Sequence, residues 1–138
     1  MTVQVTIEII IHATEDISKF YDSIKTIFDC DSDCISETST TGHYGNTITI
    51  LCITVKKRNA KKIVRVILDG LGSFDISNII SEIGSRLTES GLCLRLDKQE
   101  FVQGRLTLGD GGAIRVRIYT PVYVKRDTES EYMALLSA

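Results

Sequence analysis

The sequence predicts a single α+β domain, with a largely antiparallel sheet and helices packed on one face of it. Three observations lead to this fold class. Apolar and polar residues alternate near both ends of the chain, which is typical of half-buried strands. Apolar residues recur at helical spacing between those strands, and glycine-containing loops join neighbouring strand-like runs. The expected order is β-α-β-β-α-α-β-β-β over residues 1–126, followed by a short tail or helix at 127–138.

The first strand is expected over residues 3–13, where valine and isoleucine occupy every second position up to residue 11. A helix is expected to follow as far as about Phe28. Thr14 offers this helix a capping hydroxyl, and Glu15 and Asp16 place negative charge in its first turn.

A β-hairpin is expected next. A strand around Cys34 to Thr38 leads into a glycine-containing loop from Ser39 to Asn46, and a run of β-branched residues then continues to Val55. The two strands are expected to pair antiparallel.

Two helices are expected between this hairpin and the last strands. The first starts at Asn59, a suitable cap, and runs to Leu71, with Gly70 and Gly72 ending it. The second covers roughly residues 75–89, where isoleucine and leucine return at helical spacing.

The final strands restore the period of two. Leucines alternate over residues 92–96, and a short helical turn or bend follows from Lys98. Residues 105–108 and 114–119 are expected to form a hairpin, with Leu106 opposite an apolar residue of the second arm so that both arms turn apolar side chains to one face.

Composition limits the classes of protein to which the chain can belong. Its 138 residues, 43% of them hydrophobic, are enough for one packed core. The net charge of −2 excludes a generic polycation, so nucleic-acid binding would have to come from a local basic patch. No apolar run approaches a membrane span, and the N-terminal pattern differs from that of a signal peptide. We therefore expect a soluble, cytoplasmic protein.

The four cysteines are expected to be free thiols, because a chain without a secretion signal folds in a reducing compartment. Cys52 and Cys93 lie in apolar runs and are expected to act as small buried hydrophobes. Cys30 and Cys34 are spaced as half of a zinc site would be, but a second close pair of ligands is missing. No metal or other cofactor is therefore expected.

Charge is distributed unevenly along the chain. Residues 1–55 carry two basic and eight acidic side chains, a net charge of −6, whereas residues 56–126 carry fourteen basic and seven acidic ones, a net charge of +7. The cations of this basic segment form two groups, one where a strand meets a helix and one on the last three strands. The first group is Lys56, Lys57, Arg58, Lys61, Lys62 and Arg65, and the second is Arg95, Lys98, Arg105, Arg115, Arg117, Lys125 and Arg126.

Alternation places several arginines of the second group on the sheet face that points away from the core. Arg95, Arg115 and Arg117 are out of phase with the apolar residues of their strands, and Arg105 can join them through the expected hairpin. Four guanidinium groups on one surface could bind phosphates bidentately. The alternative, that they are ordinary solvated side chains on the polar face of a sheet, remains open.

The sequence lacks the motifs of the common catalytic sites. It contains no phosphate-binding loop, no dinucleotide-binding glycine pattern and no G-x-S-x-G turn, and it has only two histidines. The acids from Asp29 to Asp33 imitate the start of a calcium loop, but Cys34 and Thr40 replace the glycine and glutamate that such a loop requires. The protein is therefore not expected to be an enzyme.

Several segments together resemble a small archaeal RNA-binding family described as predicted exosome subunits. They are GHYGNTITI at 42–50, LRLDKQEFVQGRL at 94–106, IRVRI at 114–118 after an acidic-glycine turn, and TED at 14–16. The resemblance extends in order over nearly the whole chain. One departure is Glu100, which follows the Lys-Gln pair where the family commonly has a small apolar residue.

The resemblance implies a fold like that of ribosomal protein L five, RNA binding, and a link to the archaeal RNA-processing and degrading exosome. The residues that it carries over are Gly42, His43, Gly45 and Asn46 in the loop and Asp97, Lys98, Gln99 and Gly104 in the second block. Two roles stay open for them: direct RNA contact, or holding tight turns through glycine flexibility and side-chain bonds to the backbone.

We therefore expect a non-catalytic RNA-binding accessory protein with RNA, and through the resemblance exosome or other RNA-processing proteins, as partners. The expected RNA-binding residues are Arg95, Lys98, Gln99, Arg105, Arg115, Arg117, His43, Tyr44, Asn46, Lys56, Lys57, Arg58, Lys61 and Lys62. The alternative is a protein–protein adaptor or homodimer in which the acidic half of one chain meets the basic half of another.

Overall fold

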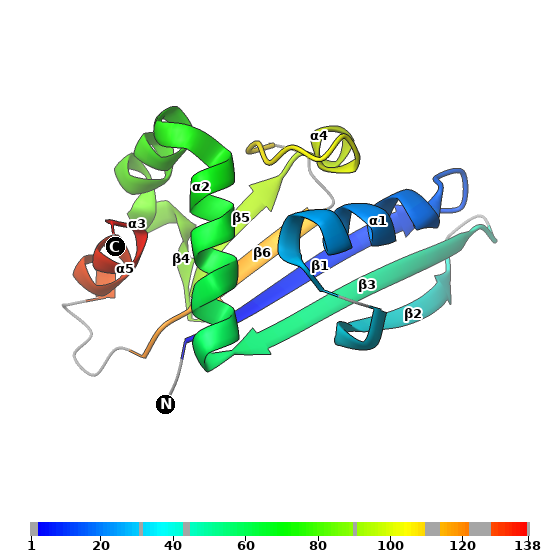
Figure 1. The fold of residues 1–138 in the computed structure, drawn as a ribbon, viewed down its shortest axis with the longest axis horizontal. Helices are drawn as coiled ribbons and strands as arrows, with labels where there is room; N and C mark the ends of the chain where they lie inside the picture. The colour runs from blue at the N-terminus through cyan, green and yellow to red at the C-terminus, as the bar shows by residue number, and fades with distance from the viewer. Residues whose placement is uncertain are drawn as a thin grey trace.

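The structure is a computed structural model and describes residues 3–30, 32–42, 45–89, 91–109, 114–121 and 128–137. Its centre is a six-stranded antiparallel sheet with the order β2-β3-β1-β6-β5-β4 (Figure 1). The strands are β1 (Gln4–His12), β2 (Ile35–Thr41), β3 (Thr47–Lys56), β4 (Leu87–Thr88), β5 (Gly91–Leu96) and β6 (Ile114–Tyr119). The predicted single-domain α+β fold and its order of elements are confirmed, with β4, and not residues 105–108, as one of the last three strands.

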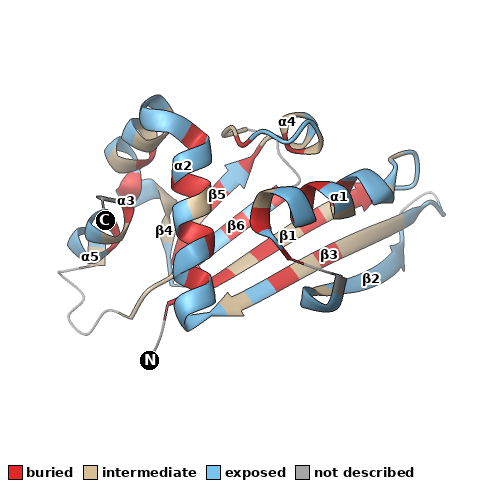
Figure 2. Cartoon of the chain, viewed as in Figure 1, coloured by how far each residue is buried: buried red, intermediate tan, exposed pale blue. Residues whose placement is uncertain are grey.

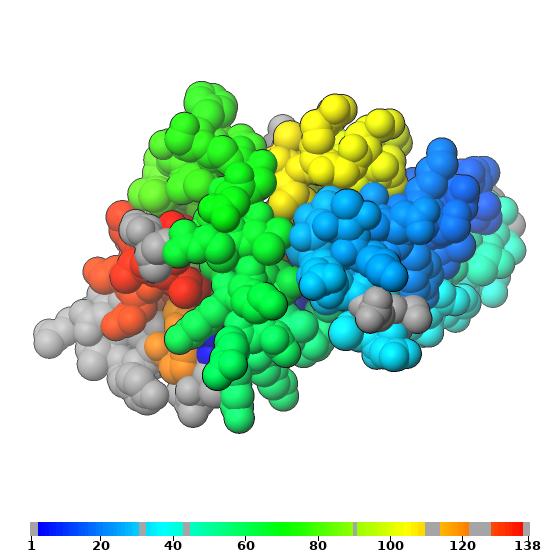
Figure 3. Space-filling view, viewed as in Figure 1, coloured from blue at the N-terminus to red at the C-terminus, as the bar shows by residue number. Residues whose placement is uncertain are grey.

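Helices cover one face of this sheet. They are α1 (Ile17–Phe28), α2 (Lys57–Ser81), α3 (Ile83–Arg86), α4 (Lys98–Val102) and α5 (Thr128–Ser137), and a short 3-10 turn, η1 (Ser32–Cys34), precedes β2. In Figure 1, α1 and the first half of α2 cross in front of the sheet, with α4 beside α1 and α3 and α5 at the β4 end. The space-filling view shows the atoms of α1, α2 and α4 closing over the sheet from this side (Figure 3).

The core forms between these helices and the sheet because strand residues alternate in burial. In β1 the odd-numbered residues from Val5 to Ile11 are buried, and their even-numbered neighbours are partly or fully exposed (Figure 2). Phe101 of α4 is completely buried, and its ring lies against that of Phe28 with the centroids 5.9 Å apart. The short turn of helix expected after β5 therefore contributes to the core.

The start of α1 differs from the prediction. Its N-cap is Asp16, whose carboxylate accepts a hydrogen bond from the Ser18 N–H at 3.0 Å. Thr14 lies instead in the turn after β1, where the Glu15 N–H donates to the His12 carbonyl at 3.0 Å. The chain completes this turn before it becomes helical, so the cap falls two residues later than expected.

Helix α2 joins the two predicted helices across a kink. Gly72 has φ 83° and ψ 168°. These angles lie outside the helical region, and glycine adopts them readily because it has no β-carbon. The predicted break at this glycine is therefore present. The predicted cap at Asn59 is wrong, because the helix already begins at Lys57 and Lys56 occupies the cap position without a side-chain cap bond.

The second predicted helix ends earlier than residue 89. The helix α2 stops at Ser81, α3 adds a short helix, and the chain then forms the two-residue edge strand β4. Gly91 follows with φ 121°, and a β-carbon at this position would lie 2.4 Å from the Ile118 carbonyl oxygen. Only glycine therefore allows β5 to approach β6 so closely.

The predicted hairpin between residues 105–108 and 114–119 is wrong. Strand β6 lies between β1 and β5 and pairs antiparallel with both. Of the segment 105–108, only Leu108 joins the sheet, through an isolated bridge to Leu96.

The segment around α4 explains this placement. The Asp97 N–H donates to the Thr107 carbonyl at 2.9 Å, and the Gly109 N–H donates to the Arg95 carbonyl at 3.0 Å. These bonds close the segment after α4 against the end of β5. The segment from Asp97 to Gly109 therefore leaves the sheet and returns to the end of β5, and β6 pairs with β1.

None of the four cysteines forms a disulfide, and two of them lie in unexpected places. Cys52 and Cys93 are out of phase with the buried residues of their strands, so both are partly exposed on the sheet face away from the helices. The prediction that they are buried is wrong. Cys30 is the buried one, and Cys34 is exposed.

Helix α5 packs beside α2 and α3 through the buried side chains of Tyr132 and Leu136. The Tyr132 hydroxyl accepts a hydrogen bond from the Thr120 N–H at 3.1 Å, which ties the helix to the end of β6. None of the described helices is both long enough and apolar enough to cross a membrane.

Candidate nucleic-acid interface

The sheet face opposite α1 and α2, here called the open face, carries three arginines. On β5 and β6 the exposed residues Arg95, Arg115 and Arg117 alternate with buried ones such as Leu94 and Val116. Their predicted direction, away from the core, is confirmed. These three residues are called the arginine cluster below.

The strand register brings the arginine cluster together. Arg95 and Arg115 are direct cross-strand partners, and Arg117 pairs with Cys93, which lies on the same strand as Arg95 and two residues before it. Opposite residues of antiparallel strands have β-carbons about 5 Å apart, and like charges in such pairs are destabilising. The sheet therefore concentrates positive charge where a neutral pair would be more stable.

One acid shares this part of the open face. Glu8 of β1 lies opposite Arg115 of β6. It is the one acidic residue that the described strands β1, β5 and β6 contain. In the part of the chain that the structure describes, Arg115 and Arg117 form no ion pair. Arg115 and Arg117 therefore outnumber the one acid, Glu8, on this part of the face.

Lys98 and Arg105 do not belong to this cluster, although the sequence suggested that they would join it. The Lys98 ammonium donates to the Glu15 carboxylate at 2.7 Å and lies 5.8 Å from the centre of the Phe20 ring, next to α1. Arg105 pairs with Glu100 of α4 through Nε at 2.5 Å. The hairpin register through which Arg105 was expected to join the strand arginines is wrong, because residue 105 is not part of a strand.

Other residues of the same block hold the α4 segment in shape. The Asp97 carboxylate caps α4 by accepting a hydrogen bond from the Glu100 N–H at 3.0 Å, and Gly104 has φ 85°. For these two residues the structure supports the turn-holding role. Gln99 is exposed on α4.

The second basic group surrounds the junction of β3 and α2. All six of its side chains are exposed, and in the described part of the chain none forms an ion pair. Lys57 has φ 59°, and its N–H donates to the Val3 carbonyl at 2.9 Å. This left-handed residue turns the chain from the sheet into the helix. The lysine cluster, as it is called below, consists of Lys56, Lys57, Arg58, Lys61, Lys62 and Arg65.

The loop between β2 and β3 borders a cleft of about 240 Å³. Asn46 is exposed beside it, and the Asn46 carbonyl accepts a hydrogen bond from the Gly42 N–H at 2.6 Å. His12 also lines the cleft, from the end of β1. The predicted contact residues His43 and Tyr44 lie outside the described residues.

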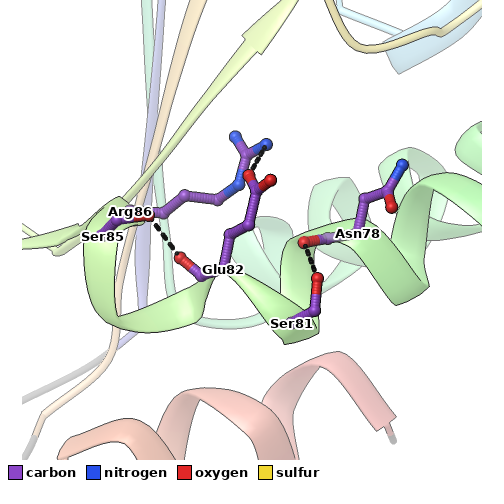
Figure 4. A network of polar contacts seen from close by, with 5 residues as sticks. All are labelled: Asn78, Ser81, Glu82, Ser85 and Arg86. Carbon is purple, nitrogen blue, oxygen red and sulfur yellow. Dashed lines mark hydrogen bonds and ion pairs between the residues drawn. The ribbon is translucent and has the colours of Figure 1, made fainter.

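The remaining basic residue of the long helical region is already paired. The Arg86 Nη2 atom lies 3.0 Å from Glu82 Oε2, and side-chain hydroxyls of Ser81 and Ser85 donate to backbone carbonyls at the same junction of α2 and α3 (Figure 4). This network holds the turn between the two helices. Across the described residues, no group of three or more histidine, cysteine, aspartate or glutamate side chains is placed to hold a metal ion.

Two further residues of the open face lie beside the arginine cluster. Tyr119, the last residue of β6, continues the alternation of Arg115 and Arg117 and is partly exposed on the same face. Glu8 lies beside the cluster because β1, and not residues 105–108, is the second neighbour of β6. The sequence already offers Tyr119 as an aromatic residue of the last strand, and the period of two in IRVRIY places it on the face of Arg115. Sequence reasoning missed Glu8, because only the sheet order reveals it.

The chain is similar to several known proteins. A family model described as RNA binding matches residues 4–120. The uncharacterized protein MJ0213 of Methanocaldococcus jannaschii is 30% identical over 123 residues, which cover 81% of this chain and 83% of the relative. The crystal structure of protein AF2318 from Archaeglobus fulgidus is 30% identical with a TM-score of 0.82 and 99% of both chains covered. That of SSO0741 from Sulfolobus solfataricus is 28% identical with a TM-score of 0.77 and 97% of both chains covered.

Proposed function

Because the chain belongs to the RNA-binding family whose model matches residues 4–120, we propose that it is a non-catalytic RNA-binding accessory protein that holds RNA phosphates on the arginine cluster. The observation that carries this proposal is the direct cross-strand pairing of Arg95 with Arg115. A bound phosphate between them would replace mutual repulsion with attraction to a shared anion.

The chemistry of the side chains favours this ligand. A guanidinium group presents a rigid fork of donors that matches two oxygens of a phosphate, and it stays charged at every physiological pH. Arg115 and Arg117 lie on one face of one strand, two residues apart, so their groups are about 7 Å apart along the strand. A row of cations with this spacing suits a polyanion better than a single small anion.

The non-catalytic part of the proposal rests on the sequence. It contains none of the motifs for nucleotide hydrolysis or for an activated serine nucleophile. Divalent-dependent cleavage of RNA by the purified protein, persisting in a preparation freed of contaminating nucleases, would contradict it.

Fluorescence anisotropy of labelled RNA over a salt series tests the binding. The double variant Arg115→Gln/Arg117→Gln is expected to bind more weakly and to lose about 1.4 from the log–log salt slope on single-stranded RNA, at about 0.7 per phosphate contact. The matched control is Lys19→Gln/Lys25→Gln, which removes two exposed charges from α1 and is expected to change neither quantity. An unchanged affinity and slope in the arginine variant, or no RNA binding at low salt, would overturn the proposal.

We further propose that the protein acts together with the archaeal RNA-processing exosome. The support is the resemblance of residues 42–50, 94–106 and 114–118 to the family described as predicted exosome subunits. The purified protein is expected to co-elute with a reconstituted exosome on size exclusion, and to do so after nuclease treatment if the contact is between proteins. Separate elution under both conditions would remove the exosome from the proposal and leave RNA binding in place.

A further inference from the structure

We propose that the open face takes single-stranded RNA, with one base stacked on the ring of Tyr119 and the strand continuing past Lys56 toward the start of α2. This inference rests on the proposed RNA binding and names both the class of RNA and its path. It depends on one row of the sheet, which runs Tyr119, Gln4, Lys56 across three neighbouring strands.

This row lies next to the arginine cluster. Tyr119 follows Arg117 by two residues on β6 and is opposite Gln4 of β1, which is in turn opposite Lys56 of β3. All lie in the phase of their strands that faces away from the core, because the residues between them, such as Ile118 and Val5, are buried. Cations therefore lie on both sides of an aromatic ring on one surface.

The spacing suits a short stretch of nucleic-acid backbone. From Arg115 to Tyr119 the strand advances by four residues, or about 13 Å, at a rise of about 3.3 Å per residue. From Tyr119 to Lys56 there are two strand spacings, or about 10 Å. A strand of a few nucleotides would cover this path, with phosphates near the arginines and near Lys56.

The uncharged part of the open face favours unpaired bases over a duplex. Ile10, Ile50, Cys52 and Tyr119 are all partly exposed there. Aromatic and apolar side chains contact the flat faces of bases, which a single strand exposes and a duplex hides within its stack. A duplex would contact the arginine cluster through its phosphates, but its bases would not stack on Tyr119.

The lysine cluster extends the path beyond the sheet. Lys56 faces the open side, whereas the left-handed Lys57 turns the chain so that Arg58 and Lys61 lie on the exposed surface of α2. In Figure 1 the lower end of α2 stands where the β3 arrow ends. An RNA strand leaving the open face at Lys56 would meet further cations there.

The test compares a labelled single-stranded RNA of about 12 nucleotides with a duplex of the same length, in anisotropy titrations. Tyr119→Leu is expected to weaken single-strand binding by roughly 5- to 150-fold, the range for loss of one stacked base, and to leave the salt slope and duplex binding unchanged. Tyr119→Phe keeps the ring and is expected to bind like the wild type. The matched control is Phe74→Leu, which removes an exposed aromatic ring (77% exposed) from the helix side.

A second measurement reports stacking directly. An RNA carrying 2-aminopurine is expected to show a fluorescence change on binding to the wild type and to Tyr119→Phe, and to lose that change with Tyr119→Leu at saturating protein. Lys56→Gln is expected to lower the salt slope on single-stranded RNA by about 0.7. Circular dichroism and the melting temperature of each variant show whether it is folded.

The outcomes separate this inference from the function on which it rests. If the arginine variant loses binding while Tyr119→Leu keeps full single-strand affinity and the 2-aminopurine signal, the stacking site is wrong and RNA binding stands. Equal affinity of the wild type for duplex and single strand would also overturn the inference. Failure of the wild type to bind either RNA would overturn the function itself.

Discussion

The ammonium group of Lys98 donates a hydrogen bond to the carboxylate of Glu15 at 2.7 Å, and so joins α4 to the turn between β1 and α1, 83 residues earlier in the chain. Both side chains are largely buried, with 13% and 24% of their surface exposed. The pair is therefore a structural link between two surface segments, and Lys98 is not available as a free cation for phosphate.

Loss of this link is expected to reduce stability and to spare RNA binding. Lys98→Gln should lower the free energy of unfolding by about 1–2 kcal/mol, because a partly buried carboxylate loses its charged partner. Urea denaturation measures the change, with Lys19→Gln as a control for the removal of an exposed lysine from α1. A loss of RNA affinity in folded Lys98→Gln would show instead that Lys98 contacts RNA.

The same link predicts a dependence of stability on acid. Partial burial raises the pKa of Glu15, but the hydrogen bonds from the Lys98 side chain and the His12 N–H outweigh burial and hold this pKa below its ordinary value of 4.5. A carboxylate with a lowered pKa stabilises the fold above the unfolded-state pKa, and this contribution is lost as the pH falls through the folded-state pKa. Between neutral pH and the region below 4.5, Glu15→Gln should therefore lose less stability than the wild type. Parallel losses in both proteins would contradict this role.

Tyr21 and Glu37 predict an effect at high pH. The Tyr21 hydroxyl donates to the Glu37 carboxylate at 2.5 Å, and this bond, with some burial, raises the pKa of Tyr21 to about 12. The stabilisation is complete below the unfolded pKa of about 10 and is lost as the pH rises toward 12. Ultraviolet titration should show one tyrosine that ionises near 12, and Tyr21→Phe should remove it. If the variant keeps that late component, another tyrosine is responsible for it.

Two glycines should differ in their tolerance of alanine. Gly91→Ala places a methyl group 2.4 Å from a backbone oxygen of β6 at φ 121°, and should destabilise the protein by roughly 3 kcal/mol. Gly70→Ala instead meets the Leu106 side chain at 2.7 Å, within a helix that favours alanine, so its net effect should be smaller. Thermal unfolding of both variants measures which substitution lowers the melting temperature more. A larger decrease in Gly70→Ala than in Gly91→Ala would contradict this prediction.

The elements that the sequence predicted best are those with long, regular apolar periods. The alternation in residues 3–13 identified β1, and the helical spacing of isoleucines identified both halves of α2. Each pattern arises because one face of the strand or helix is buried along its whole length, so apolar residues recur with the period of that element. Gly72 was predicted as a break because glycine alone tolerates its backbone angles without strain.

The errors concern pairings between distant segments. Apolar and polar residues alternate over residues 105–108 as in a strand. The backbone hydrogen bonds of this segment nevertheless join it to the end of β5 and not to β6. The pattern of apolar residues within a segment does not indicate which strand lies on the second side of β6. For this reason Arg105 was placed with the arginine cluster, and Glu8, which does lie beside Arg115, was not.

The two edges of the sheet limit how this chain can polymerise. On one side β4 has two residues and offers almost no backbone for another strand to join. On the other side β2 is seven residues long, but after Ile35 its side chains are hydroxyl-bearing or acidic and exposed. A foreign strand added there would gain backbone hydrogen bonds and bury little apolar surface, so the usual driving force for fibril growth is weak. The order of the strands therefore disfavours edge-to-edge pairing between copies, because a very short strand and a polar strand form the two edges and β1 and β6 lie at the centre.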